Sequence, residues 1–223
     1  MIASTDFRFF IDVAAYTHAS WFPAIPQTVT AHAMGSVSAR QLLSRWLIRG
    51  QALEVPGKLT LDDNERWLLA GRDRVAEMAR SLGLTLVAPV IRVLVFRKDV
   101  EKIRAAFGDD GYAASLELPG LSERRIGRGW LDRASSIEEI RESVAVLGHA
   151  LLSQQLQADE RQLKARLRLM FPRVWPAHMA DDLPEMAVPV GEWLRHHDFT
   201  NSEGGASAIQ SAGVASTDQQ SQR

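Results

Sequence analysis

The chain has 223 residues, 46% of them hydrophobic, which is enough for one large domain or two small ones with a buried core. Its 26 basic and 27 acidic residues leave a net charge of -1, which argues against a dedicated nucleic-acid binder, and the lack of cysteine excludes disulfides, thiol nucleophiles and cysteine-bound metals. No apolar run is long enough for a transmembrane helix, and Asp6, Arg8 and Asp12 interrupt any signal-peptide pattern, so we expect a cytoplasmic protein without membrane insertion.

The first 50 residues predict short apolar segments separated by breaks. Residues 6–16 fit either a short helix or an extended anchor, which periodicity does not separate. Pro23 and Pro26 then break any helix. Residues 37–49 predict a helix that Gly50 ends. One face of that helix carries Leu42, Leu43, Trp46 and Leu47.

A second apolar helix is expected after residue 62. Asp62 or Asp63 can cap it, because a side-chain oxygen there accepts from the amides of the first turn. Gly71 lies inside it and weakens it by roughly 1 kcal/mol relative to alanine, and Gly83 ends it. Its apolar residues, spaced by three and four, are Trp67, Leu68, Val75, Met78, Ala79 and Leu82.

Residues 84–96 have the composition of a strand, whereas Pro89 suits the first position of a helix. We predict a helix, because no second alternating run exists to pair with, and a lone strand leaves its backbone groups unbonded. Residues 98–107 predict a further short helix that Gly108 closes, and one or two more turns follow over residues 111–118.

Residues 120–133 form the most irregular interior segment, in which glycines alternate with arginines. Gly127-Arg128-Gly129 looks superficially like a phosphate loop, but it lacks the spaced glycines and the following lysine that cradle phosphates. We interpret the arginines as a solvated loop. Docking of Arg124 and Arg125 to an acidic partner surface is the alternative.

Two more helices are expected before the chain changes character. The pattern Ser136-Ile137-Glu138-Glu139 is a capping box, in which the hydroxyl bonds forward and a carboxylate bonds back. A polar break over residues 154–159 precedes a helix capped by Asp159 and ended by Pro172. Its apolar side carries Leu163, Leu167 and Met170. Its opposite, solvated side carries Lys164, Arg166 and Arg168.

Beyond about residue 200 the chain is rich in Ser, Gln, Gly and Ala and has no aromatic residue. Such a segment buries too little apolar surface to offset its ordering entropy. The sequence therefore predicts a single irregular all-α domain over residues 1–199 and a disordered tail over residues 200–223.

No motif in the sequence indicates catalysis or cofactor binding. His196 and His197 are adjacent and would point about a hundred degrees apart on a helix, so they do not share a metal readily. The aspartate pairs at 62–63 and 109–110 fit caps and turns, and no Gly-x-Ser-x-Gly elbow occurs. We expect a protein that is not an enzyme and takes neither a cofactor nor a metal.

The segment from Asp12 to Trp21 is the most distinctive of the chain and predicts a structural anchor. Tyr16, His18 and Trp21 are the first candidates for partner contacts, with burial in the fold as the alternative reading. Trp130 and Trp175 lie near predicted loops and are further candidate partner anchors.

Three segments together resemble a known family. Ala14-Ala15-Tyr16-Thr17-His18 resembles the Pro-Ala-Ala-Tyr-Leu-His signature of the SctK family of type III secretion proteins, which includes YscK, PscK and the rhizobial nodulation protein NolU. Residues 79–86 resemble the Arg-Leu-Gly-Leu segment of that family, and the helices near residues 144–169 resemble its C-terminal half. The resemblance extends to about Pro176. Val13 and Thr17 depart from the signature, which has proline and leucine there.

The resemblance implies an all-helical adaptor in the sorting platform beneath the inner-membrane ring. Its partners would be the ring protein (SctD) and the pod protein (SctQ), and through the pod the stator (SctL) and the ATPase (SctN). The alternative is a helical regulatory or nucleic-acid-binding protein that uses the arginines of residues 120–133 and the basic helix face. A small-molecule enzyme with a deep, ionisable pocket is a third hypothesis.

Overall fold

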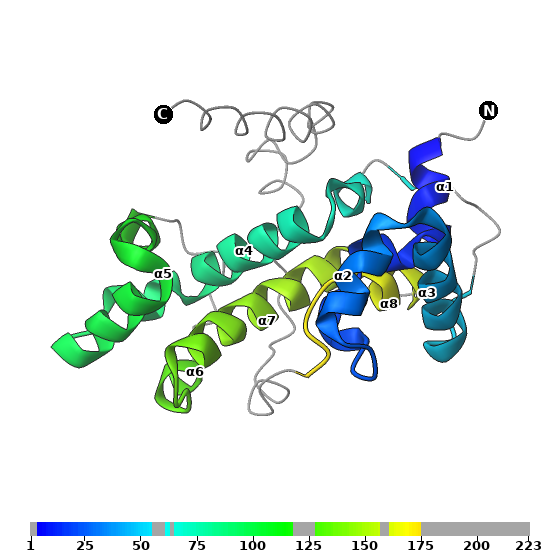
Figure 1. Ribbon diagram of the computed structural model, residues 1–223. Coiled ribbons are helices and arrows are strands. Elements are labelled where there is room, and N and C mark those ends of the chain that lie inside the picture. Colours follow the sequence, from blue (N-terminus) through cyan, green and yellow to red (C-terminus); the bar gives the residue numbers. More distant parts are fainter. Residues whose placement is uncertain (1–3, 55–60, 63–64, 118–127, 157–160, 175–223) are drawn as a thin grey trace, which may run out of the picture.

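A computed structural model describes five parts of the chain: residues 4–54, 61–62, 65–117, 128–156 and 161–174 (Figure 1). Within these parts the chain forms eight α-helices, three short 3-10 helices and no strand. The prediction of a single irregular all-α domain is therefore confirmed. The predicted tail over residues 200–223 and the boundary at residue 199 lie outside the described residues.

The first 50 residues form a cluster of short elements. They are α1 (Ser4–Ile11), η1 (Val13–Tyr16), η2 (Ala19–Trp21), α2 (Gln27–Gly35) and α3 (Val37–Gly50). Of the two readings of residues 6–16, the helix is confirmed, and a 3-10 helix rather than an extended anchor follows it. Helix α2 was not predicted. Pro26 breaks the preceding segment as predicted, but it also occupies the N-cap of α2.

The middle of the chain forms η3 (Arg66–Ala70), α4 (Arg72–Arg92) and α5 (Arg97–Glu117). The prediction that Gly83 ends a helix was wrong, because α4 runs through Gly83 and carries Pro89 in its interior. The break lies instead at Gly71, which has a φ of 85° that glycine adopts without strain. The predicted stop at Gly108 is confirmed by a kink in α5, where φ is 77°.

The C-terminal part of the fold comprises α6 (Gly129–Asp132), α7 (Ile137–Gln155) and α8 (Arg161–Leu169). The predicted cap of α7 is confirmed, because the Ser136 hydroxyl accepts from the Glu139 amide at 3.1 Å. The Glu139 carboxylate reaches back one residue further than expected and accepts from the Ser135 amide at 2.6 Å. The predicted polar break over residues 154–159 begins later than expected, because α7 continues to Gln155. Residues 157–159 of that break, with the predicted cap at Asp159, lie outside the described residues.

Helices α4 and α7 lie antiparallel along the centre of the molecule and share the most extensive contact of the described elements (Figure 1). Gly83 of α4 meets the backbone of Val144 in α7, and Gly148 of α7 meets the backbone of Ala79 in α4. A Cβ on either glycine would overlap a carbonyl oxygen of the other helix. The pair packs this closely because both glycines lack a side chain.

The α4–α7 pair separates the two ends of the molecule. The α1–α3 cluster lies at the end where α4 begins, and α5 leads away from the end where α4 stops (Figure 1). The 21 residues of α4 span about 31 Å at 1.5 Å per residue. The side chains along the pair form a continuous core. Its fully buried members include Val75, Met78, Leu82, Val144, Leu151 and Leu152.

Replacing Gly148 with alanine tests the backbone contact between α4 and α7. We expect Gly148→Ala to lower the free energy of unfolding by about 3 kcal/mol, because the helices must move apart to admit the methyl group. The measurement is urea denaturation followed by circular dichroism. The control is Gly35→Ala on α2, where an added Cβ meets nothing within 4 Å. Equal stability of the two variants would contradict this packing.

Candidate protein-interaction surfaces

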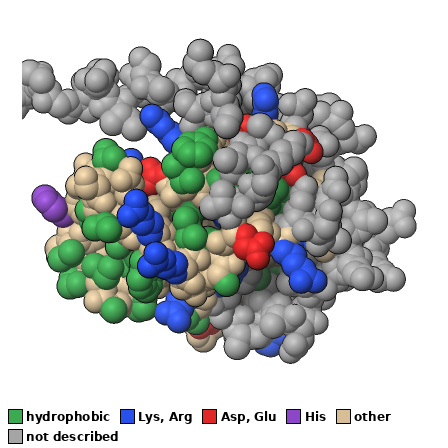
Figure 2. All heavy atoms as spheres, turned by 90° about the vertical axis from the view of Figure 1, so that its right-hand side faces the viewer, with side chains coloured by type: hydrophobic (Ala, Val, Ile, Leu, Met, Phe, Trp, Pro, Cys, Tyr) green, Lys and Arg blue, Asp and Glu red, His purple; other side chains and the backbone are tan. Residues whose placement is uncertain are grey.

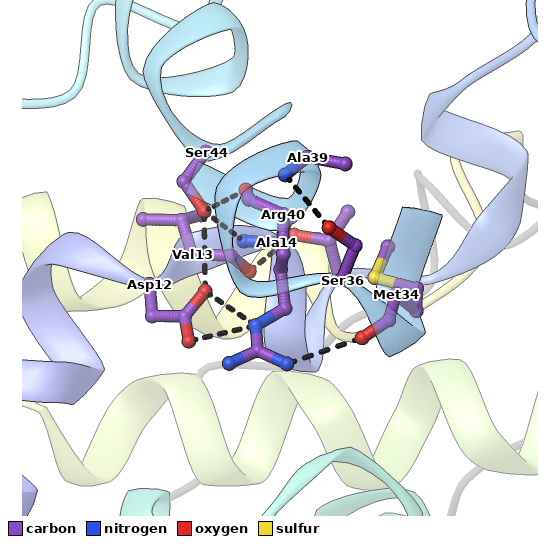
Figure 3. Close-up of polar contacts among 9 residues, drawn as sticks. Asp12, Val13, Ala14, Met34, Ser36, Ala39, Arg40 and Ser44 are labelled. Atoms are coloured by element: carbon purple, nitrogen blue, oxygen red, sulfur yellow. Dashed lines mark hydrogen bonds and ion pairs between the residues drawn. The ribbon is translucent and has the colours of Figure 1, made fainter. Parts of the chain in front are cut away.

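The segment that follows α1 is fastened to α3 by a polar cluster (Figure 3). The Asp12 carboxylate accepts from Arg40 Nε at 2.9 and 3.0 Å, and the same guanidinium donates to the Met34 carbonyl at 3.1 Å. Ser44, which is buried in α3, accepts from the Ala14 amide at 3.0 Å. These contacts fix the start of the distinctive segment against the interior face of α3.

Tyr16 belongs to the core and does not present a surface to a partner. Its hydroxyl donates to the Phe9 carbonyl at 3.0 Å, and its ring stacks on the Phe9 ring with the centroids 5.0 Å apart. Burial raises the pKa of the Tyr16 phenol, although Arg166 nearby opposes that shift. The reading of Tyr16 as a buried fold determinant, which the sequence left open, is the one that the geometry supports.

His18 and Trp21 attach the same segment to the end of α8 and the residues just after it. The His18 amide donates to the Leu169 carbonyl at 2.7 Å, and the Trp21 indole donates to the Phe171 carbonyl at 2.9 Å. The His18 ring accepts from the Ser20 amide and so caps η2. Both side chains are half-buried. Their polar atoms therefore hold the chain together rather than project toward a partner.

Arg166 corrects the prediction of a solvated basic face on α8. The side chain is completely buried and lies over the Phe10 ring at 5.3 Å. It donates to the carbonyls of Glu54 at 2.9 Å and Gln162 at 3.2 Å, with no carboxylate among its described partners. Burial lowers its pKa. Arg168 on the same helix donates to the Arg173 carbonyl at 2.8 Å.

Of the remaining candidates, only Trp130 lies in the described residues. Trp130 lies in α6 and is buried with Leu131, which favours a role in the core and lends no support to its prediction as a partner anchor. Arg124, Arg125 and Trp175 lie outside the described residues. The burial of Trp130 follows from the helical turn of α6, which turns Trp130 and Leu131 into the core.

A groove of about 610 Å³ runs beside His18, between the start of α4 and the first turns of α7. Charges of both signs line it. Arg72 pairs with Asp73 at 3.0 Å, and Arg141 pairs with Glu138 at 3.2 Å. Burial, Arg72 and Arg168 lower the pKa of His18, so its ring is neutral near pH 7. The mixture of charges favours no single class of ligand.

The outer face of α3 is the surface that the sequence reading missed. The sequence predicts that Leu42, Trp46 and Leu47 share one apolar face of this helix. In the structure Leu47 is fully buried, whereas Leu42 is 65% exposed and Trp46 is 51% exposed. At 100° per residue, Arg45 and Arg49 lie on the same outward side. We call Leu42, Arg45, Trp46 and Arg49 the α3 outer face. Together with Gly50 they line a groove of about 530 Å³.

Figure 2 views the end of the molecule at which α3 lies, and hydrophobic and basic side chains alternate there over a wide area. A further groove, of about 750 Å³, lies between α1 and α3. Phe7, Ile11 and Val37 expose apolar surface along it. Apolar side chains are thus available on both sides of the α1–α3 cluster.

A second exposed apolar surface lies where α4 turns into α5. Val93, Val95 and Phe96 are all exposed, Val95 by 88%. Arg128 holds this turn in place through an ion pair of 2.7 Å with the buried Asp99. We call Val93, Val95 and Phe96 the α4–α5 corner. It lies at the opposite end of α4 from the α1–α3 cluster (Figure 1).

Comparison with protein-family models, with curated proteins and with solved structures gives no match for this chain. The described residues include no group of three His, Asp or Glu side chains that could hold a metal ion. Among the helices of the described parts, none has both the length and the apolar character needed to span a bilayer.

Arg166 offers a test of the buried contacts that hold the N-terminal segment. We expect Arg166→Ala to lower the free energy of unfolding by about 3 kcal/mol, because buried carbonyl oxygens lose a charged donor. Arg49→Ala, on the exposed side of α3, should change it by less than about 0.5 kcal/mol. Chemical denaturation measures the free energy of unfolding of both variants. An equal decrease in the two variants would refute a buried role for Arg166.

His149 makes the protein sensitive to acid. Its ring packs edge-on against the Phe171 ring at 4.8 Å, and burial lowers its pKa from 6.5 to about 3. The unfolded chain therefore binds a proton between these two values that the folded chain does not. Stability should fall as the pH drops below about 6.5, by about 2 kcal/mol at pH 5.

The measurement is urea denaturation at pH 7 and at pH 5 for the unmodified chain and for His149→Gln. The variant should lose most of that pH dependence, since glutamine does not titrate. If His149→Gln loses as much stability between pH 7 and pH 5 as the unmodified chain, groups other than His149 cause the pH dependence.

Proposed function

We propose that this protein is a non-enzymatic adaptor of a bacterial type III protein secretion system, which links the inner-membrane ring protein (SctD) to the pod protein (SctQ). The resemblance of residues 14–18 and 79–86 to the SctK family supports the proposal. The structural observation that carries it is the presence of two exposed apolar surfaces at opposite ends of α4. Through the pod, the adaptor would connect to the stator and the ATPase at the inner membrane.

An adaptor has to hold two partners at once without steric conflict. The α3 outer face lies at the end of the molecule where α4 begins, and the α4–α5 corner lies where α4, about 31 Å long, stops (Figure 1), which leaves room for a separate domain at each. The α4–α7 pair between them is packed backbone to backbone, so the distance between the two surfaces is fixed. Exposed apolar side chains among charged neighbours are typical of protein–protein interfaces.

The nucleic-acid hypothesis has less support from the geometry. It relied in part on the basic face of α8, but Arg166 is buried and Arg168 is bound to backbone carbonyls. Arg124 and Arg125, its other basis, lie outside the described residues. The net charge of -1 also offers no general attraction for phosphates.

The proposal is tested by mixing the full chain with the cytoplasmic domain of the ring protein and with the pod protein, then separating complexes by size-exclusion chromatography. We expect a ternary complex of all three. Leu42→Glu should abolish binding of one partner and leave binding of the other unchanged. Val95→Glu should abolish binding of the second partner only. Each substitution places a charge in one of the two apolar interfaces.

Val174→Glu is the matched control, because Val174 is 80% exposed and belongs to neither surface. It should bind both partners normally. Binding of the unmodified chain to neither partner would refute the adaptor function. Loss of both partners from each single variant would refute the assignment of one partner to each end.

A further inference from the structure

We infer that the α3 outer face binds an acidic amphipathic helix of a partner protein. The inference deepens the proposed function, since it states the chemistry of one of the two partner sites. The relevant observation is that leucine and tryptophan alternate with two arginines on an outward helix surface where nothing in the described structure covers them.

The apolar part of this face is suited to a helix. Leu42 and Trp46 are four residues apart, so they form one ridge along α3, and Gly50 continues the line with open space where its side chain would be. The line from Leu42 to Gly50 is about 12 Å long, which two turns of a partner helix match. Residues at i, i+4 and i+7 of such a helix would pack along it.

Trp46 is pre-organised for binding. Its ring lies against the ring of the buried Phe22 with the centroids 6.1 Å apart, so one side of the indole is supported while about half of the residue remains exposed. A supported tryptophan loses little conformational entropy when a partner covers it. Tryptophan and arginine are also the residue types most enriched at energetic centres of interfaces.

The two arginines of the α3 outer face indicate that the partner helix is negatively charged. Arg45 and Arg49 both border the groove, which no acidic residue lines, and neither forms an ion pair within the described part of the chain. By contrast, Arg40 on the inward side of the same helix is neutralised by Asp12 at 2.9 Å. A partner with glutamate or aspartate beside its apolar stripe would neutralise Arg45 and Arg49. A partner with lysine there would be repelled.

The experiment uses the full chain and two labelled helical peptides of about 15 residues with identical leucines at i, i+4 and i+7. One peptide carries glutamate beside the leucines and the other carries lysine. We expect the glutamate peptide to bind at least about tenfold more tightly by fluorescence anisotropy. Trp46→Ala should weaken that binding by at least about tenfold. Arg45→Glu combined with Arg49→Glu should reverse the preference between the peptides.

The control is Arg97→Glu combined with Arg104→Glu, which changes the net charge equally on exposed positions of α5. This variant should keep the preference for the glutamate peptide. Equal binding of the two peptides, or binding of neither, would overturn the inference. The inference would also be overturned if the chain formed a dimer through Trp46, or if single-stranded nucleic acid displaced the glutamate peptide from the α3 outer face.

The result separates this inference from the proposed function. If the ring and pod proteins bind but neither peptide does, the adaptor function stands and the acidic helix is wrong. If the glutamate peptide binds as expected but neither partner protein does, the surface stands and the secretion-system function is wrong.

Discussion

The close approach of α4 and α7 is the contact on which the rest of the structure depends. Gly83 and Gly148 bring the two backbones together, and every larger residue at these positions would force them apart. Because the two helices pack backbone to backbone, the pair sets where the α1–α3 cluster and the α4–α5 corner lie relative to each other (Figure 1). The proposed adaptor function needs such a spacer.

The distinctive N-terminal segment is used to build the fold rather than to meet a partner. Asp12 and Tyr16 bond to α3 and α1, and His18 and Trp21 bond to the end of α8 and the residue Phe171 beyond it. This segment therefore joins the beginning of the described chain to its end. Exposed apolar surface is left elsewhere, on the outer face of α3 and at the α4–α5 corner.

Local signals predicted some elements well. The capping pattern at Ser136 and the stop at Gly108 depend only on a few neighbouring residues, and both appear where expected. The same local reasoning failed at Gly83, because a glycine that ends a helix and one that admits a neighbouring helix look alike in sequence. The partner surface of Gly83 is Val144, 61 residues away, which no local pattern indicates.

The sequence by itself determined that the chain is helical, where several helices begin, and that it has a core, since spacing and caps act within one or two turns. Only the tertiary structure decided which apolar residues remain outside. Leu42 and Leu47 share a helix and a chemical type, yet one is exposed and the other buried because α1 and η1 cover only one side of α3. Likewise, Arg166 is buried because carbonyls from distant segments converge on it, and burial of this kind depends on contacts that periodicity does not encode.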